Sequence, residues 1–204
     1  MTQLSDNKNA FTHTDLPSLK APLLSVRNLE IRFSDRTGDA PAVHKLSDQL
    51  GHGRTLGVVG EGGCGKTITA LAILDLLDPP GKITEGEIKL EGKDLRLLSS
   101  DTRAKIRGSK IGMVFQEPLT ALNPVFTIGE QIAEVVVQHL HFSKKDASSR
   151  AIELLDLVRV PSPDKRIRDY PHQLSGGLRQ RAMIAMAIAG EPILLIADEP
   201  TTAL

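Results

Sequence analysis

The sequence predicts an α/β fold built around a parallel core sheet. Residues 55–59 (TLGVV) form a short β-branched run that leads into a glycine-rich loop and then into an apolar stretch with helical spacing at residues 68–77. A second apolar run, residues 193–197 (ILLIA), lies near the end of the sequence. Short apolar runs that alternate with helical segments are typical of strands buried on both faces of a parallel sheet.

The other elements follow from periodicity. After Leu24, the apolar residues Leu29, Ile31 and Phe33 alternate with charged residues, which predicts a half-buried strand. Residues 36–41 are interpreted as a turn. Further strands are expected at 85–90 and 110–115, and helices at 127–139, 143–158 and from Ser175 to about residue 189. The segment between the last two strands is therefore nearly all helical.

Two of these helices carry explicit start signals. Thr127 is followed by Glu130, and Ser143 by Asp146. In each case a hydroxyl that can cap the first turn precedes an acidic residue at the third helical position. These pairs fix the two helix starts more firmly than periodicity alone.

Length and composition limit the function. A chain of 204 residues with 40% hydrophobic residues fits one globular domain, and its single cysteine excludes an internal disulfide. The 25 Lys and Arg residues balance the 25 Asp and Glu residues, so net charge gives no support for a nucleic-acid partner. The polar residues 1–22 are interpreted as a disordered tail, and the domain as residues 23–204.

The chain also lacks an apolar run of the roughly 18 residues that cross a bilayer. Its first residues have no apolar stretch typical of a secretory signal. We therefore expect a cytosolic protein whose membrane role, if it has one, is peripheral.

The glycine-rich loop has the pattern G-x-x-x-x-G-K-[ST] of a phosphate loop (Walker A), between a predicted strand and a predicted helix. Glycines let backbone N–H groups turn toward phosphate oxygens, and the helix start adds positive potential. Lys66 is expected to reach the β and γ phosphates and the Thr67 hydroxyl to bind Mg²⁺. The alternative is an ordinary glycine turn with a solvated lysine. The nucleotide-binding loop comprises Gly60, Glu61, Gly62, Gly63, Cys64, Gly65, Lys66 and Thr67.

Cys64 is unusual in this loop, because a thiol at a helix start can be reactive. It is interpreted as a small filler residue, with a regulatory thiol as the alternative.

Two carboxylates, Asp198 and Glu199, follow the apolar run at 193–197 directly. The carboxyl ends of parallel strands are where α/β sheets bind ligands. Asp198 is expected to hold Mg²⁺ and Glu199 to act as the general base that polarises the attacking water. A solvated strand end is the alternative.

Residues 174–181 (LSGGLRQR) resemble the signature of ABC transporter ATP-binding subunits. Ser175 at a helix cap with Gly176 and Gly177 would expose backbone donors as a second anion site. The resemblance implies a P-loop NTPase (RecA-like) fold with a parallel core sheet. It also implies an N-terminal antiparallel β part and a helical signature subdomain at about 117–180.

The same resemblance assigns further roles. It implies ATP and Mg²⁺ as ligands, with Gln116 contacting Mg²⁺ and the attacking water and Phe33 stacking on adenine. Two subunits, identical or similar, would pack head to tail, so that the signature of one closes on the γ-phosphate held by the other.

Residues 116–124 (QEPLTALNP), 128–132 (IGEQI) and 170–173 (YPHQ) are similar to the importers of dipeptides, oligopeptides, glutathione and nickel chelates. This implies an ATPase that powers import of a di- or oligopeptide from the cytoplasmic face of the cell membrane. Its partners would be membrane permease subunits and, indirectly, an extracytoplasmic solute-binding protein. The family more often has serines at Gly62 and Cys64.

The resemblance would place further core strands and a switch histidine after Leu204, so the sequence is interpreted as a C-terminally truncated subunit. The alternative to an active ATPase is then a nucleotide-binding but catalytically incompetent subunit. A third hypothesis, an ABC-type ATPase of DNA maintenance, requires long coiled-coil arms. The segment between Gln116 and Ser175 is too short for them and has no heptad pattern.

Overall fold

The computed structural model describes residues 21–35 and 38–200. The chain forms two compact units that divide between Leu98 and Ser99. The predicted tail at residues 1–22 lies almost entirely outside the described residues.

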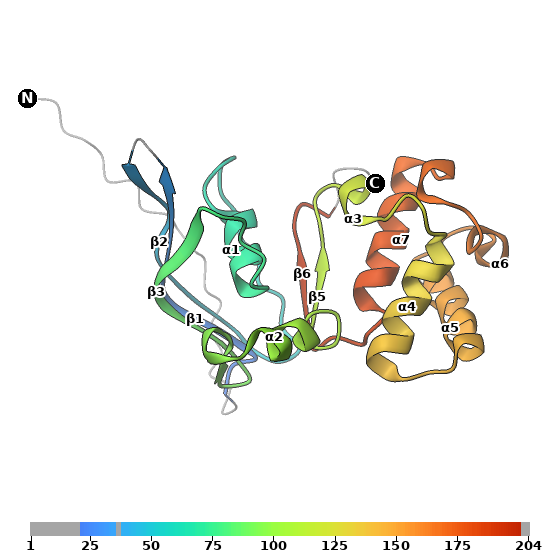
Figure 1. Ribbon diagram of the computed structural model, residues 1–204, viewed down its shortest axis with the longest axis horizontal. Coiled ribbons are helices and arrows are strands. Elements are labelled where there is room, and N and C mark those ends of the chain that lie inside the picture. Colours follow the sequence, from blue (N-terminus) through green and yellow to red (C-terminus); the bar gives the residue numbers. More distant parts are fainter. Residues whose placement is uncertain (1–20, 36–37, 201–204) are drawn as a thin grey trace, which may run out of the picture. The chain divides into compact units, whose positions relative to one another are not determined.

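The first unit is an antiparallel sheet with one helix (Figure 1). Its strand order is β2-β1-β3-β4, and β1 pairs with both β2 and β3 along most of its length. Leu29 and Ile31 of β1 are fully buried, as the alternating pattern predicts. The elements are β1 (Leu24–Asp35), β2 (Gly38–Leu50), α1 (Lys66–Ile73), β3 (Gly81–Leu90), β4 (Lys93–Asp94) and a 3-10 turn, η1 (Leu95–Leu97).

Strand β2 corrects the predicted turn at 36–41, because the chain is already a strand from Gly38. Its sequence contains Pro41 and several charged residues, which are unfavourable in a central strand. The structure places β2 at the sheet edge, where a residue without an N–H can be accommodated.

The strand predicted at residues 55–59 is also wrong. Residues 54–59 form no strand, and Val58 and Val59 are 51% and 91% exposed. A β-branched sequence becomes a strand only when a neighbour pairs with its backbone. Among the described residues, no strand pairs with this segment.

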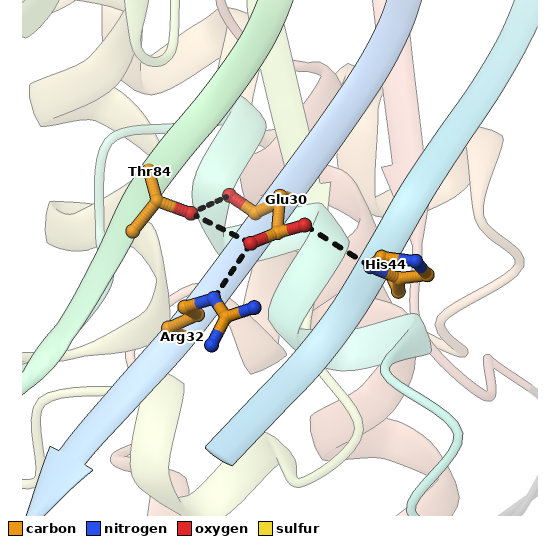
Figure 2. Close-up of polar contacts among 4 residues, drawn as sticks. All are labelled: Glu30, Arg32, His44 and Thr84. Atoms are coloured by element: carbon orange, nitrogen blue, oxygen red, sulfur yellow. Dashed lines mark hydrogen bonds and ion pairs between the residues drawn. The ribbon is translucent and has the colours of Figure 1, made fainter. Parts of the chain in front are cut away.

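A polar cluster joins the three long strands of this sheet (Figure 2). Glu30 of β1 is only 6% exposed and accepts a hydrogen bond from Arg32 Nε at 2.6 Å. Thr84 of β3 donates to the same carboxylate oxygen, Oε1, at 3.4 Å, and the other oxygen, Oε2, lies 3.0 Å from His44 Nδ1 of β2. The Arg32 hydrogen bond, supported by His44 and opposed by desolvation, lowers the pKa of Glu30 below its usual 4.5.

The second unit contains the parallel pair β5 (Ile111–Val114) and β6 (Leu194–Ala197), in register from Ile111–Leu194 to Val114–Ala197. These are the predicted strands at 110–115 and 193–197. Helices α4, α5 and α7 form a group beside the pair (Figure 1) and share one apolar core. The helices are α2 (Ser100–Ile106), α3 (Pro118–Ala121), α4 (Ile128–Leu140), α5 (Lys144–Leu157), α6 (Pro163–Arg166), η2 (Pro171–Gln173) and α7 (Gly176–Ile188).

The predicted helix starts are confirmed. The Thr127 hydroxyl accepts from the Glu130 backbone N–H, and the Glu130 carboxylate accepts from the Thr127 N–H at 2.7 Å, which completes a capping box. The Ser143 hydroxyl accepts from the Asp146 N–H. Within the described ranges, no helix combines the length and apolar character needed to cross a membrane.

Candidate functional site

The phosphate loop occupies residues 60–67 of the first unit and opens directly into α1. Gly63 and Gly65 have φ angles of 82° and 92°, a left-handed conformation that favours glycine. The Lys66 ammonium folds back over the loop, donating to the carbonyls of Gly60 at 2.7 Å and Glu61 at 3.1 Å. The loop therefore gathers a cation and a helix N-terminus at one point, as an anion site requires.

Gly65 has backbone and side-chain atoms of β2 close beside it, which leave no space for a Cβ atom. A Cβ built on it would lie 2.8 Å from the Ala42 carbonyl oxygen and 2.9 Å from Val43 Cγ2, both on β2. Gly62, in contrast, has open space around it. The loop is thus seated against β2 at Gly65 while its tip stays exposed.

Cys64 is exposed, and its Sγ lies 3.7 Å from Lys66 Nζ. A Cβ on Gly60 would lie 2.5 Å from that sulfur. The sulfur therefore lies close against Gly60, and both the filler interpretation of Cys64 and its regulatory alternative stay predictions. Thr67 is exposed on the first turn of α1.

Phe33 lies at the end of β1, half-buried and paired with Gly81 of β3. A Cβ on Gly81 would lie 2.8 Å from two ring atoms of Phe33, so the ring covers this glycine closely. The aromatic ring is thus fixed in the same unit as the phosphate loop. Its stacking on adenine stays a prediction.

The acidic pair lies in the second unit, at the carboxyl ends of the parallel strands. Asp198 is buried and its backbone N–H donates to the Val114 carbonyl at 2.9 Å, which continues the β5–β6 ladder by one residue. Glu199 is exposed and has a φ angle of 46°, which is uncommon for a residue with a side chain. Gln116 donates from Nε2 to Glu199 Oε2 at 2.8 Å. The structure therefore brings together three residues that the sequence predicts for one site.

The signature segment starts α7 in the same unit. The Ser175 hydroxyl accepts from the Leu178 N–H at 3.4 Å, and Ser175 and Gly176 are both exposed. Gly176 also has open space beside it. A helix start with an exposed cap leaves backbone donors accessible to an anion.

Three contacts of this segment are not predicted from the sequence. Arg179 donates to the Pro171 carbonyl at 2.7 Å, and Arg181 to the Arg159 carbonyl at 2.6 Å. Gln180 donates to the carbonyl of Pro200. Each side chain ties α7 to a different segment. The sequence places these three residues in the signature segment, but that position alone does not predict which carbonyls they contact.

The predicted site residues thus fall on two units. Phe33 and the phosphate loop belong to the first unit, and Gln116, Asp198, Glu199 and the signature belong to the second. A Mg²⁺ ion shared by Thr67, Gln116 and Asp198 therefore stays a prediction. Over the described part of the chain, no group of three or more His, Cys, Asp or Glu residues is arranged to hold a metal. Mg²⁺ bound to a nucleotide usually needs fewer, because phosphates and waters supply the other ligands.

Comparison with known proteins agrees with these motifs. Residues 43–202 match the ABC transporter family. The chain is 50% identical to the oligopeptide transport ATP-binding protein OppD of Bacillus subtilis over 89% of its length and 51% of OppD. It is 46% identical to the dipeptide transport ATP-binding protein DppD of Escherichia coli over 89% of its length and 56% of DppD. The chain therefore spans about half the length of the curated relatives it matches.

Among solved structures, the fold matches the dimeric structure of MJ0796, a bacterial ABC transporter cassette, with a TM-score of 0.79 and 29% identity. The match covers 89% of this chain and 75% of the cassette. A structure of the same cassette in a post-hydrolysis state with ADP and Pi matches equally well. The family match, the relatives and this fold together show that the chain belongs to the ABC transporter ATP-binding family.

Proposed function

We propose that this chain binds Mg²⁺-ATP and hydrolyses it to drive import of di- or oligopeptides through a membrane transporter. The observation that carries the nucleotide part is the phosphate loop, in which Lys66 and left-handed glycines precede α1. The peptide part is supported by the relatives, which are named as oligopeptide and dipeptide transport ATP-binding proteins.

The residues of the loop fit a triphosphate. Lys66 is held by two neutral carbonyls, which are weaker acceptors than phosphate oxygens. Its ammonium would exchange these contacts for the β and γ phosphates, while the loop N–H groups bind the remaining oxygens. Phe33 would cover the adenine from the end of β1. Mg²⁺, held by Thr67, Gln116 and Asp198, would neutralise charge on the transferred phosphate.

The second unit would supply the hydrolytic groups. Gln116 and Glu199 are in direct contact, so a water beside the pair would be oriented by the amide and deprotonated by the carboxylate. Ser175, Gly176 and Gly177 would present their donors to the nucleotide of a second subunit packed head to tail. Membrane permease subunits and an extracytoplasmic solute-binding protein would complete the assembly at the cytoplasmic face of the membrane.

The test compares Mg²⁺-ATP binding by the wild type and Lys66→Ala in isothermal titration calorimetry, with phosphate release measured in parallel. Lys93→Ala, which removes the same charge from β4, is the matched control. We expect Lys66→Ala to weaken binding by about 100-fold, since it removes a charged contact to two phosphates, and the control to bind as the wild type does. Equal binding by all three proteins would refute the proposal. The peptide part requires that cells with Lys66→Ala lose uptake of a labelled tripeptide.

A further inference from the structure

Gln180 is a fully buried polar residue on a helix face that is otherwise apolar. Residues 180, 183 and 187 of α7 share one face by helical spacing, and Met183 and Ala187 of that face pack with Val114 of β5. A buried carboxamide is unfavourable unless it is hydrogen-bonded. An apolar side chain would suit this position better if packing were its only role.

Only one half of the Gln180 amide has a partner. Its Nε2 donates to the Pro200 carbonyl, whereas Oε1 is buried without a hydrogen bond among the described residues. The Pro200 carbonyl can only accept a hydrogen bond, so the group that faces it must be the Gln180 NH₂. A flipped amide would place its oxygen there, which could not donate. Among the residues that the structure describes, the hydrogen bond to Pro200 is therefore the one polar contact of this side chain.

Pro200 follows Glu199 directly, and Glu199 has the left-handed φ angle of 46°. Such a conformation persists only when its surroundings hold it. On one side, the Asp198 N–H bonds to Val114 of β5. On the other side, the Pro200 carbonyl bonds to Gln180. The backbone of Glu199 is therefore fixed between a strand and the signature helix.

We propose that Gln180 is a positioning residue for Glu199, which links the signature helix α7 to the turn that carries the general base. The inference rests on the proposed ATPase function. Gln180 does not touch the reacting atoms in this proposal. It acts through the Pro200 carbonyl, so its loss should displace the Glu199 carboxylate while leaving the phosphate loop intact.

Gln180→Glu gives a pH-dependent test. The ionised carboxylate cannot donate to Pro200, but the protonated acid can, and burial raises the pKa of such a carboxyl. At about pH 8 we expect kcat for ATP to fall about tenfold with KM changed by less than about threefold. At about pH 6 the ratio of variant to wild-type kcat should return toward one. Gln180→Met, which cannot donate at any pH, should show the loss without the recovery.

Gln131→Glu is the matched control. Gln131 is also buried in this unit, and its amide donates to the carbonyls of Asn123 and Phe126, far along the chain from Glu199. It should lose thermal stability like Gln180→Glu, but its kcat should not follow the same pH-dependent recovery. A kcat profile shared by both variants would assign Gln180 a merely structural role and overturn the proposal.

A second readout does not need turnover. Amide hydrogen exchange of Asp198 and Glu199, measured by mass spectrometry, should accelerate about tenfold in Gln180→Met while exchange in α4 stays as in the wild type. Unchanged exchange at these two residues overturns the positioning role, even in a protein that binds ATP without hydrolysing it. If the wild-type protein does not bind ATP, the proposed function is refuted. The exchange result would still decide whether Gln180 positions Glu199.

Discussion

The phosphate loop of the first unit and the acidic turn of the second unit are fixed by different parts of the chain. In the loop, the backbone supplies the acceptors and the close packing: two loop carbonyls accept from the Lys66 ammonium, and Gly65 packs against the backbone of Ala42. In the acidic turn, one backbone bond joins Asp198 to Val114, and two side chains from other segments add to it, since Gln116 bonds to Glu199 and Gln180 bonds to Pro200.

This difference follows from what each part is proposed to bind. A phosphate group needs several N–H donors at once, which only backbone free of Cβ atoms can supply. A general base needs one carboxylate held in one direction, which neighbouring side chains can supply. Substitutions should therefore affect binding in the first unit and turnover in the second.

The largest effect is expected for Glu199→Gln. Loss of the proposed general base should lower kcat by about 10²- to 10⁴-fold while Mg²⁺-ATP affinity stays within about threefold. Glu134→Gln, the same change on the exposed face of α4, is the control and should keep wild-type kcat. Phosphate release and calorimetric binding provide the measurements. A variant that binds weakly but turns over normally would contradict the division between the units.

Gly65→Ala tests the close backbone contact between the phosphate loop and β2. The new Cβ would meet the Ala42 carbonyl at 2.8 Å, and the φ angle of 92° is strained for alanine. We expect Mg²⁺-ATP affinity to fall by more than about tenfold. Gly62→Ala, in the same loop but in open space, should have a smaller effect. If the two variants lose the same amount of Mg²⁺-ATP affinity, the contact of Gly65 with β2 does not determine binding.

A smaller effect is expected for Glu30→Gln, which tests the sheet that supports the loop. Glu30 connects β1 with β2 and β3, whereas Glu87 pairs with Lys89 of its own strand. Hydrogen bonds from Arg32 and from Lys89, respectively, lower the pKa of both carboxyls. We expect Glu30→Gln to lower the unfolding temperature by about 3 °C, and Glu87→Gln to lower it less.

The pH dependence of this effect has a definite sign. A carboxyl whose pKa is lower in the folded state stabilises the fold above its unfolded pKa, near 4.5 for Glu30, and loses that contribution as pH falls through the folded value. The difference between the wild type and Glu30→Gln should therefore be full near neutral pH and shrink below about pH 4.5. Thermal unfolding monitored by circular dichroism at several pH values measures it. A difference that grows on acidification would contradict this account.

The sequence predicted the parts of the site whose chemistry is local. The phosphate loop, the carboxylates after β6 and the cap at Ser175 each follow from adjacent residues. The two strands of the parallel pair were also found, because each is a short apolar run that pairs along its full length.

The features that the sequence did not predict depend on contacts between residues that are distant in the sequence. The start of edge strand β2, within the predicted turn at 36–41, looks like a turn because the edge position permits Pro41. Residues 55–59 look like a strand although nothing among the described residues pairs with them. The burial of Glu30 depends on His44 and Thr84 from two other strands. The Gln180 contact joins a helix to a turn that only the folded chain brings near it.

The smallest effect is expected for Thr127→Ala, which removes the capping hydroxyl of α4. Its loss should destabilise the protein by about 1 kcal/mol. Ser149→Ala, within α5, is the control, because its hydroxyl makes only a 3.4 Å bond to the Lys145 carbonyl, and should cost less than about 0.5 kcal/mol. Chemical denaturation gives both values. Because α4 contributes apolar residues to the helical core but none to the phosphate loop, ATP affinity per folded molecule should not change. A loss of affinity in Thr127→Ala would mean that binding depends on the second unit's helices as well as on the loop.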